Sequence, residues 1–391
     1  MSFPRRLASP PGPAGTSAAS ESLPPGPSLL LDIVRFAAAF MVAFGHISQG
    51  FFSQDTKNLT TYAYDAVSVF FVLSGFVIRY ITRTRMGNLQ SYAIDRVSRI
   101  YSVALPALLL TLLLDTVSYS ANPGFYSKHW GQGLHHPVVG LVLNMLFLSQ
   151  AWFQDISPLS NSPFWSLGYE CVYYAVYGAA FYLMGRARVI SLLLIFLLIG
   201  PTVFLAFPIW LLGVVTYDVF AEGKLTFIGS VKLLGVASLA VVGIHGTYRL
   251  ANHFHLPFAY QLLGRRINLM NGPMDKVALV TAALILGACW SLKNLRSNEK
   301  HWLILAIRRL ADSTFVLYLV HFPILVLVAS TVHYNRSRWV ARLVTLVGVV
   351  LFSVMISPWL DSLKKIMRKA LSRELRIGCP RASNEKAESP V

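Results

Sequence analysis

The chain has 391 residues, of which 55% are hydrophobic and only 13% charged, and its formal net charge is +17. Soluble domains carry about 25% charged residues, so the composition excludes an ordinary soluble protein. The positive charge does not indicate a nucleic-acid partner, because the basic residues lie between apolar segments, where orientation signals belong. The sequence therefore predicts an integral membrane protein whose first partner is the lipid bilayer.

The two ends of the chain differ from its middle. Residues 1–27 are rich in Pro, Ser, Ala and Gly, and no apolar signal-peptide core follows Arg5 and Arg6. We predict a disordered cytoplasmic tail there. Residues 361–391 are expected to form a second cytoplasmic tail, first basic and then disordered. The transmembrane domain then covers residues 28–360.

Within residues 28–360 we predict an all-α helix bundle of about ten transmembrane helices, because a span needs about 20 mostly apolar residues. Residues 138–152 are apolar but short for a span, which predicts one re-entrant or interfacial helix. The expected spans are residues 28–50, 62–81, 100–118, 164–184, 188–206, 208–221, 231–246, 276–292, 311–332 and 339–360.

The distribution of Lys and Arg predicts how the bundle is oriented. One set of loops, which includes the segment from Arg83 to Arg99 and the lysines after residue 360, is clearly richer in basic residues than the other set. Such loops stay in the cytoplasm. We therefore expect a multi-pass membrane protein with both termini in the cytoplasm. A full crossing by residues 138–152 would largely cancel this asymmetry.

Two ionisable residues of the first span, Arg35 and His46, lie eleven positions apart. Helical geometry places them on nearly the same face, about 16 Å apart along the axis. An ionisable residue inside a span is costly and indicates a functional site. One alternative for Arg35 is a simple ion pair with Asp32, one turn earlier.

Near the predicted outer face, one imidazole and two carboxylates lie at similar depth: His46, Asp65 and Glu170. A carboxylate that orients an imidazole lets that imidazole take a proton from a hydroxyl. We therefore predict that these three residues are catalytic. The alternative is that they only bridge helices by hydrogen bonds. For His321, in the ninth predicted span, a structural role and a site role are equally well supported.

At the predicted cytoplasmic end, guanidinium groups gather: Arg35, Arg79, Arg96 and Arg99. Guanidinium groups bind phosphates through paired hydrogen bonds, so this end would suit a phosphate-bearing donor. Arg79, with the nearby Arg83 and Arg85, is better explained as an orientation signal.

No metal site is predicted. Cys171, Cys289 and Cys379 are scattered and fit no metal-ligand spacing. The pair His253 and His255 has no third ligand nearby. A catalytic role for Cys171, beside Glu170, is less well supported than simple packing.

Five segments, taken in order, resemble the acyltransferase-3 family of integral membrane acyltransferases, which O-acylate bacterial surface and exported carbohydrates. They are LDIVRFAAAFMVAFGH with Arg35 and His46, YDAVSVFFVLSGFVI with Asp65 and Ser74, RVSRIYS with Arg96 and Arg99, FWSLGYE with Trp165, Ser166 and Glu170, and STFVLYLVHFPIL with His321. Ser102 departs from the pattern, because the family commonly has proline there.

The resemblance implies an O-acyltransferase, above all an O-acetyltransferase. Acyl-CoA, chiefly acetyl-CoA, would be a co-substrate rather than a bound cofactor, held by Arg35, Arg96 and Arg99. The acyl group would pass to a hydroxyl of a carbohydrate or glycolipid at the outer face. His46 would be the general base, oriented by Glu170 or Asp65. Residues with a substrate-binding or structural role would be Ser74, Trp165, Ser166 and His321.

A secondary transporter, or a carrier of lipids or glycans, is the alternative function. Intramembrane charges of this kind also occur in such proteins. A transporter of this type is usually built from paired broken helices or an internal repeat. Neither is evident in the sequence, which therefore favours the enzyme.

Overall fold

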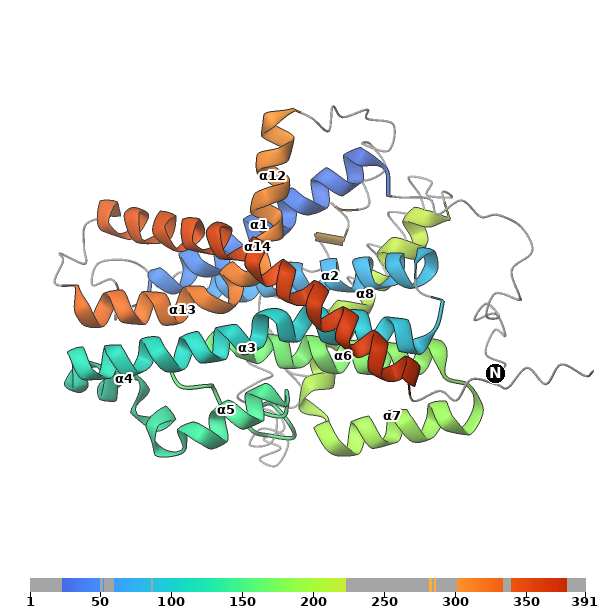
Figure 1. Ribbon diagram of the computed structural model, residues 1–391, viewed down its shortest axis with the longest axis horizontal. Helices are drawn as coiled ribbons and strands as arrows, with labels where there is room; N and C mark the ends of the chain where they lie inside the picture. Colours follow the sequence, from blue (N-terminus) through green and yellow to red (C-terminus); the bar gives the residue numbers. More distant parts are fainter. Residues whose placement is uncertain are drawn as a thin grey trace, which may run out of the picture.

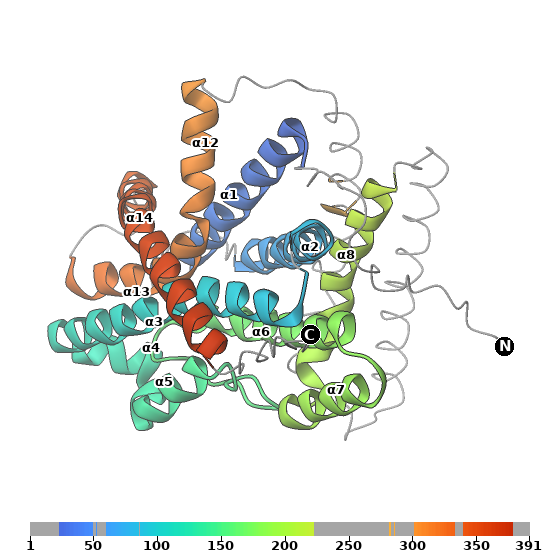
Figure 2. The same cartoon turned by 45° about the vertical axis from the view of Figure 1, so that its right-hand side comes forward.

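The computed structural model describes residues 23–49, 52, 60–85, 87–222, 281–282, 285, 301–332 and 339–377. In these ranges the regular structure is helical, and no strand occurs. Figures 1 and 2 show long helices packed side by side, with one shorter helix, α12, standing across the bundle. The prediction of an all-α protein is therefore confirmed for the described residues.

The helices follow in chain order, with two short 3-10 segments. They are α1 (Pro25–Ile47), α2 (Thr60–Thr84), α3 (Leu89–Ala121), α4 (Pro123–His135), α5 (Pro137–Met145), η1 (Ser162–Phe164), α6 (Trp165–Tyr182), α7 (Gly185–Ile199), η2 (Thr202–Ala206), α8 (Phe207–Ala221), α12 (Trp302–Asp312), α13 (Thr314–Thr331) and α14 (Trp339–Ile377).

Six segments of the described chain are long and apolar enough to cross a membrane. They lie in α1, α2, α3, η2 with α8, α13 and α14, and they match six of the ten predicted spans. The expectation of about ten spans is not confirmed. Where two others were expected, α6 contains a glutamate and many tyrosines, and α7 has only 15 residues, about 22 Å of helix. The predicted spans 231–246 and 276–292 lie outside the described residues, apart from helical positions 281, 282 and 285.

The short apolar segment 138–152 contains a single nine-residue helix, α5, followed by turns. Nine residues rise only about 13 Å, which is less than half the hydrocarbon thickness of a bilayer. The segment is therefore short, as expected. Whether it re-enters the membrane stays a prediction, as does the disorder of the tails, since residues 1–22 and 378–391 lie outside the described residues.

The last helix is longer than the sequence analysis expected. α14 continues through Pro358 and ends at Ile377, so the predicted domain boundary at residue 360 falls inside a helix. Residues 361–377 contain neither glycine nor proline and are rich in good helix formers, which explains why the helix continues. Figure 1 shows α14 crossing over α3.

Glycines bring two helices of the bundle unusually close together. A Cβ atom built on Gly75 of α2 would lie 2.0 Å from the Trp210 carbonyl oxygen of α8, and one on Gly213 of α8 would lie 2.0 Å from the Val72 carbonyl oxygen. Small residues that let backbones touch are typical of membrane helix packing. The contact also fixes Ser74, whose Oγ accepts a hydrogen bond from the Trp210 indole at 3.1 Å.

The helix termini show which parts of the chain lie at the same end of the bundle. α1 and α3 begin, and α2 and α14 end, at the end on the right of Figure 1, which we name the basic end. The C-terminal ends of α1, α3 and α13 lie at the opposite end. The start of α1 and the end of α14 thus share one end of the bundle.

Cysteine labelling tests which end faces the cytoplasm. Gly87, at the basic end, and Gly124, at the opposite end, are exposed, and a Cβ atom at either meets no atom within 4 Å. In a chain whose native cysteines are replaced by alanine, we expect an impermeant maleimide to label Gly124→Cys in intact cells. Gly87→Cys should react only after permeabilisation, because Lys and Arg mark cytoplasmic loops. Labelling of Gly87→Cys from outside would reverse the orientation.

Candidate functional site

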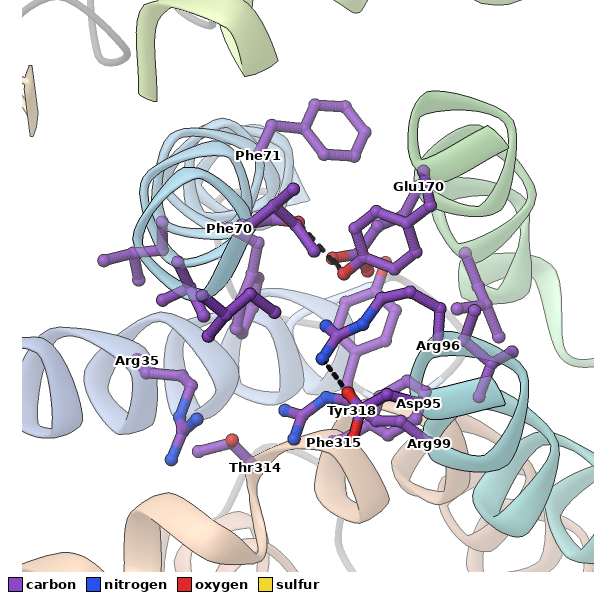
Figure 3. A pocket seen from close by; sticks show the side chains of 18 of the residues that line it. Arg35, Phe70, Phe71, Asp95, Arg96, Arg99, Glu170, Thr314, Phe315 and Tyr318 are labelled. Atoms are coloured by element: carbon purple, nitrogen blue, oxygen red, sulfur yellow. Dashed lines mark hydrogen bonds and ion pairs between the residues drawn. The ribbon is translucent and has the colours of Figure 1, made fainter. Parts of the chain in front are cut away.

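A cavity of about 490 Å³ lies towards the basic end of the bundle, and we name it the basic cavity. Its lining includes two carboxylates, Asp95 and Glu170, against six cationic side chains: Arg35, Arg85, Arg96, Arg99, Lys364 and Arg368. Figure 3 shows Arg35 of α1 on one side of the space and Arg96 and Arg99 of α3 on the other. The three arginines predicted to bind a donor therefore line one cavity.

Several guanidinium groups in this cavity have fewer hydrogen-bond and ion-pair partners than they could bind. Arg96 donates to the Asp95 carboxylate, and its guanidinium lies 5.6 Å from the centre of the Tyr174 ring. The Nε atoms of Arg35 and Arg96 are buried without a hydrogen-bond partner among the described residues. Arg99 has no ion pair in the same part of the chain, and its charge repels that of Arg35. Six cations face only two carboxylates in the lining, so the cavity suits an anion.

Arg35 does form the ion pair that was considered as an alternative. Its Nη2 lies 3.2 Å from Asp32 Oδ1 and 4.0 Å from Asp312 Oδ1. The pairing with Asp32 is therefore real, yet it leaves Nε unpaired and the side chain in the cavity wall. The ion pair orients Arg35 rather than removing it from the site.

Arg79, in contrast, is a structural residue. Its Nε donates to Asp218 of α8 at 2.8 Å, and its Nη1 donates to the Tyr177 hydroxyl of α6 at 3.3 Å. Arg83 approaches the same carboxylate at 3.6 Å. Arg79 is not part of the lining of the basic cavity. It therefore joins α2 to α6 and α8, whereas the sequence placed it beside the other arginines.

A second cavity, of about 160 Å³, lies towards the opposite end, and we name it the polar cavity. His46 lines it. Most of the other lining groups are amides, a carboxylate, hydroxyls and aromatic rings, from Gln49, Gln150, Asp155, Ser157, Ser162, Tyr64, Trp165 and Tyr169. This mixture of flat aromatic faces and hydrogen-bonding groups, with a single carboxylate, suits a neutral ligand with several hydroxyls.

Two imidazoles form a hydrogen-bonded pair beside the polar cavity. His46 Nδ1 lies 3.0 Å from His321 Nε2, and His321 Nδ1 lies 2.8 Å from the Tyr318 carbonyl oxygen and 3.1 Å from the Leu317 carbonyl oxygen. Carbonyls only accept, so we assign the proton of His321 to Nδ1 and let its Nε2 accept from His46 Nδ1. His46 Nε2 then keeps an unshared electron pair, as a general base requires.

The expected partners of His46 lie elsewhere. Glu170 lines the basic cavity and accepts a hydrogen bond from the Tyr174 hydroxyl, which lies 3.1 Å from Ser74 Oγ. Asp65 lines neither cavity, and its Oδ1 is buried without a hydrogen-bond partner among the described residues. The imidazole of His321, and neither carboxylate, orients His46. Glu170 and Asp65 were expected to contact His46 because of their similar depth in the membrane, but depth alone does not bring side chains together.

Two residues, Val67 of α2 and Tyr318 of α13, line both cavities, so the two spaces meet at these side chains. The Tyr318 hydroxyl donates to the Pro163 carbonyl oxygen at 3.0 Å and lies 2.5 Å from Ser166 Oγ. Its backbone carbonyl accepts from His321. One turn of α13 thus both separates the cavities and positions the imidazole pair, a role for Tyr318 that the sequence analysis missed.

Trp165 and Ser166, at the start of α6, face different spaces. Trp165 lines the polar cavity, whereas Ser166 lines the basic cavity beside Tyr318. Lys364 and Arg368, which were assigned to a tail, also line the basic cavity. Their spacing of four residues could have indicated that both side chains lie on one helix face. This inference requires that the helix continue past residue 360.

Fold and site define a multi-helix membrane protein in which an oriented imidazole pair lies beside a polar cavity, and this polar cavity meets a cationic one. The Acyl_transf_3 family model, described as an acyltransferase domain, matches residues 29–358. The chain therefore belongs to the acyltransferase-3 family, in agreement with the resemblance seen in its sequence. The family match and the six candidate spans together describe a membrane protein with an acyltransferase domain.

A curated relative is acyltransferase MdmB of Streptomyces mycarofaciens, which is 29% identical over 153 residues. The aligned part is 37% of this chain and 36% of the relative, so the match spans about a third of either protein. No solved structure matches the chain.

Proposed function

We propose that the protein is an O-acyltransferase that moves an acyl group, chiefly acetyl, from acyl-CoA to a hydroxyl of a carbohydrate or glycoconjugate. The observation that carries the proposal is the pair of cavities that meet at Val67 and Tyr318. One cavity is cationic, the other is polar and contains His46, and they approach this boundary from opposite ends of the bundle. Such an arrangement lets a donor and an acceptor enter from opposite sides of the membrane.

The donor occupies the basic cavity in this proposal. Coenzyme A carries its negative charges on phosphates at one end and its thioester at the other, joined by a long uncharged arm with amide groups. Arginines bind phosphates well because the guanidinium offers paired donors. With the phosphates at Arg96 and Arg99, the arm runs past Glu170, whose carboxylate can accept from an amide N–H. The thioester then reaches Ser166 and Tyr318.

The acceptor occupies the polar cavity, on the side that we expect to face away from the cytoplasm. Tyr64 and Trp165 offer aromatic faces, and Gln150 and Asp155 offer hydrogen-bonding groups. A volume of about 160 Å³ suits a single sugar ring better than a longer chain. The acceptor is therefore a neutral, hydroxyl-rich group such as one residue of a glycan or glycolipid.

Acyl transfer in this site needs a single base. His46 Nε2 takes the proton of the acceptor hydroxyl as the oxygen attacks the thioester carbonyl carbon. The carbon–sulfur bond then breaks, and the proton passes from His46 to the sulfur, so that coenzyme A leaves as its thiol. His321 Nε2 accepts from His46 Nδ1 throughout, and this hydrogen bond strengthens while His46 is positively charged.

Purified full-length protein tests the proposal. We expect it to bind acetyl-CoA and, with a suitable acceptor from a panel of glycosides, to release coenzyme A and form the O-acetyl ester. A His46→Gln variant is the matched control, because glutamine fills similar space but cannot act as a base. Absence of both acetyl-CoA binding and coenzyme A release in the wild type would reject the proposal.

The imidazole pair makes a separate prediction about His321. In a His321→Leu variant, His46 Nδ1 loses its hydrogen bond to His321, and this bond no longer fixes the tautomer of His46. Such a hydrogen bond contributes about 0.5–1.5 kcal/mol. We expect kcat to fall about 10- to 100-fold. His321→Gln, whose amide oxygen can replace Nε2 as the acceptor, should recover part of this loss. The measurement is kcat of both variants, and thermal unfolding checks that the two variants are equally stable. Equal activity of the two variants would contradict a positioning role.

A further inference from the structure

The C-terminal part of α14 lies beyond the segment that defines the family. The family match ends at residue 358, whereas α14 continues to Ile377. Figure 1 shows this part of the helix lying over α3, the helix that carries Arg96 and Arg99. Two of its side chains, Lys364 and Arg368, line the basic cavity one helical turn apart.

Both side chains interact with the charged groups of α3. Arg368 Nη1 lies 3.6 Å from Asp95 Oδ1, and Asp95 is also the partner of Arg96. Lys364 lies close enough to Arg96, Arg99 and Asp95 to interact electrostatically with each of them. The carboxylate of Asp95, of which only 9% is exposed, therefore interacts with three cations from two helices, Arg96 of α3 and Lys364 and Arg368 of α14.

The excess of positive charge on α3 and α14 in the basic cavity favours binding of a ligand with several negative charges. Like charges held a few ångströms apart in a protein repel one another, and removing them from water adds a further cost. A group with two or more phosphates would relieve both effects through charge-assisted hydrogen bonds. The side chain of Arg368 is 56% exposed, so it lies where a ligand enters and not at the inner end near Tyr318.

We propose that Lys364 and Arg368 of α14, together with Arg96 and Arg99 of α3, bind the phosphate-bearing nucleotide end of the acyl-CoA donor. The proposal rests on the function proposed above. It assigns donor binding to a segment outside the family domain. The end of α14 is then a binding element of the enzyme and not a tail.

The test compares two donors and two double variants of the full-length protein. Lys364→Ala with Arg368→Ala removes the proposed contacts. Lys365→Ala with Lys369→Ala is the matched control, because it removes two charges from the same helix turns at exposed positions outside the cavity lining. The donors are acetyl-CoA and S-acetylpantetheine, which has the same thioester arm but no phosphate.

We expect the first double variant to raise the KM for acetyl-CoA about 10- to 100-fold, since two charge-assisted contacts are lost. Its kcat/KM for S-acetylpantetheine should stay at the wild-type value, and the control variant should match the wild type with both donors. Equal losses with both donors would show a merely structural role and overturn the inference, as would an unchanged KM for acetyl-CoA. If the wild type itself neither binds nor uses acetyl-CoA, the proposed function fails as well.

Discussion

Replacing His46 by alanine is expected to lower the rate of acyl transfer by about 10²- to 10⁴-fold, the usual contribution of a general base. His46 is the imidazole that lines the polar cavity, and its Nδ1 is engaged with His321, so Nε2 is the nitrogen left to accept a proton. No other imidazole lines either cavity in the described part of the chain. The measurement is kcat with saturating acetyl-CoA and acceptor.

The same variant should bind the donor normally, which separates loss of chemistry from loss of fold. His46 does not line the basic cavity, so the affinity for acetyl-CoA should remain at the wild-type value. His46→Gln, which retains an N–H that can donate to His321, should be as inactive as His46→Ala but closer to the wild type in thermal stability. A His46→Ala protein with near-normal turnover would refute the mechanism.

A second large effect is expected when Arg96 and Arg99 are both replaced by lysine. Each hydrogen bond to a charged group contributes about 1.5–3 kcal/mol, and lysine cannot form the paired contact of a guanidinium. We expect the Kd for acetyl-CoA to rise at least about tenfold. Insertion and topology should be unchanged, because both residue types act alike as orientation signals. Titration of the purified double variant against wild type is the measurement.

Arg79→Lys is the matched control for this prediction. Arg79 lies on the same end of the bundle but binds Asp218 and Tyr177 outside the basic cavity. Its replacement should lower thermal stability slightly and leave donor affinity unchanged. Equal affinities of the wild type and the Arg96→Lys, Arg99→Lys variant would reduce these two arginines to orientation signals and leave the donor site unlocated.

Hydropathy and residue order were sufficient to predict much of this protein. The all-helical class, six of the expected spans and the family follow from apolar segments of the right length and from five motifs in order. The position of Arg35, Arg96 and Arg99 in one cavity was also expected, because the predicted spans place all three towards the cytoplasmic side. Their role in binding a donor stays a prediction.

Position along a span could not predict which side chains meet. His46, Asp65 and Glu170 were grouped because they lie at similar depth, but depth leaves the rotation of each helix undetermined. In the fold, α6 turns Glu170 towards the basic cavity, and α13 brings His321 to His46. Residues 46 and 321 are 275 positions apart, so no local pattern links them.

Composition and residue order alone predict that the chain folds as membrane helices, which end of the bundle is basic and which ionisable residues lie inside spans. These properties depend on the composition of single segments and on the cost of placing charge in lipid. The packing of the helices is needed to see that His321 orients His46, that Tyr318 separates two cavities and that Lys364 and Arg368 join Arg96 and Arg99. Each of these depends on how helices distant in sequence are rotated and packed, because a contact between helices is a property of the pair and is encoded in neither segment alone.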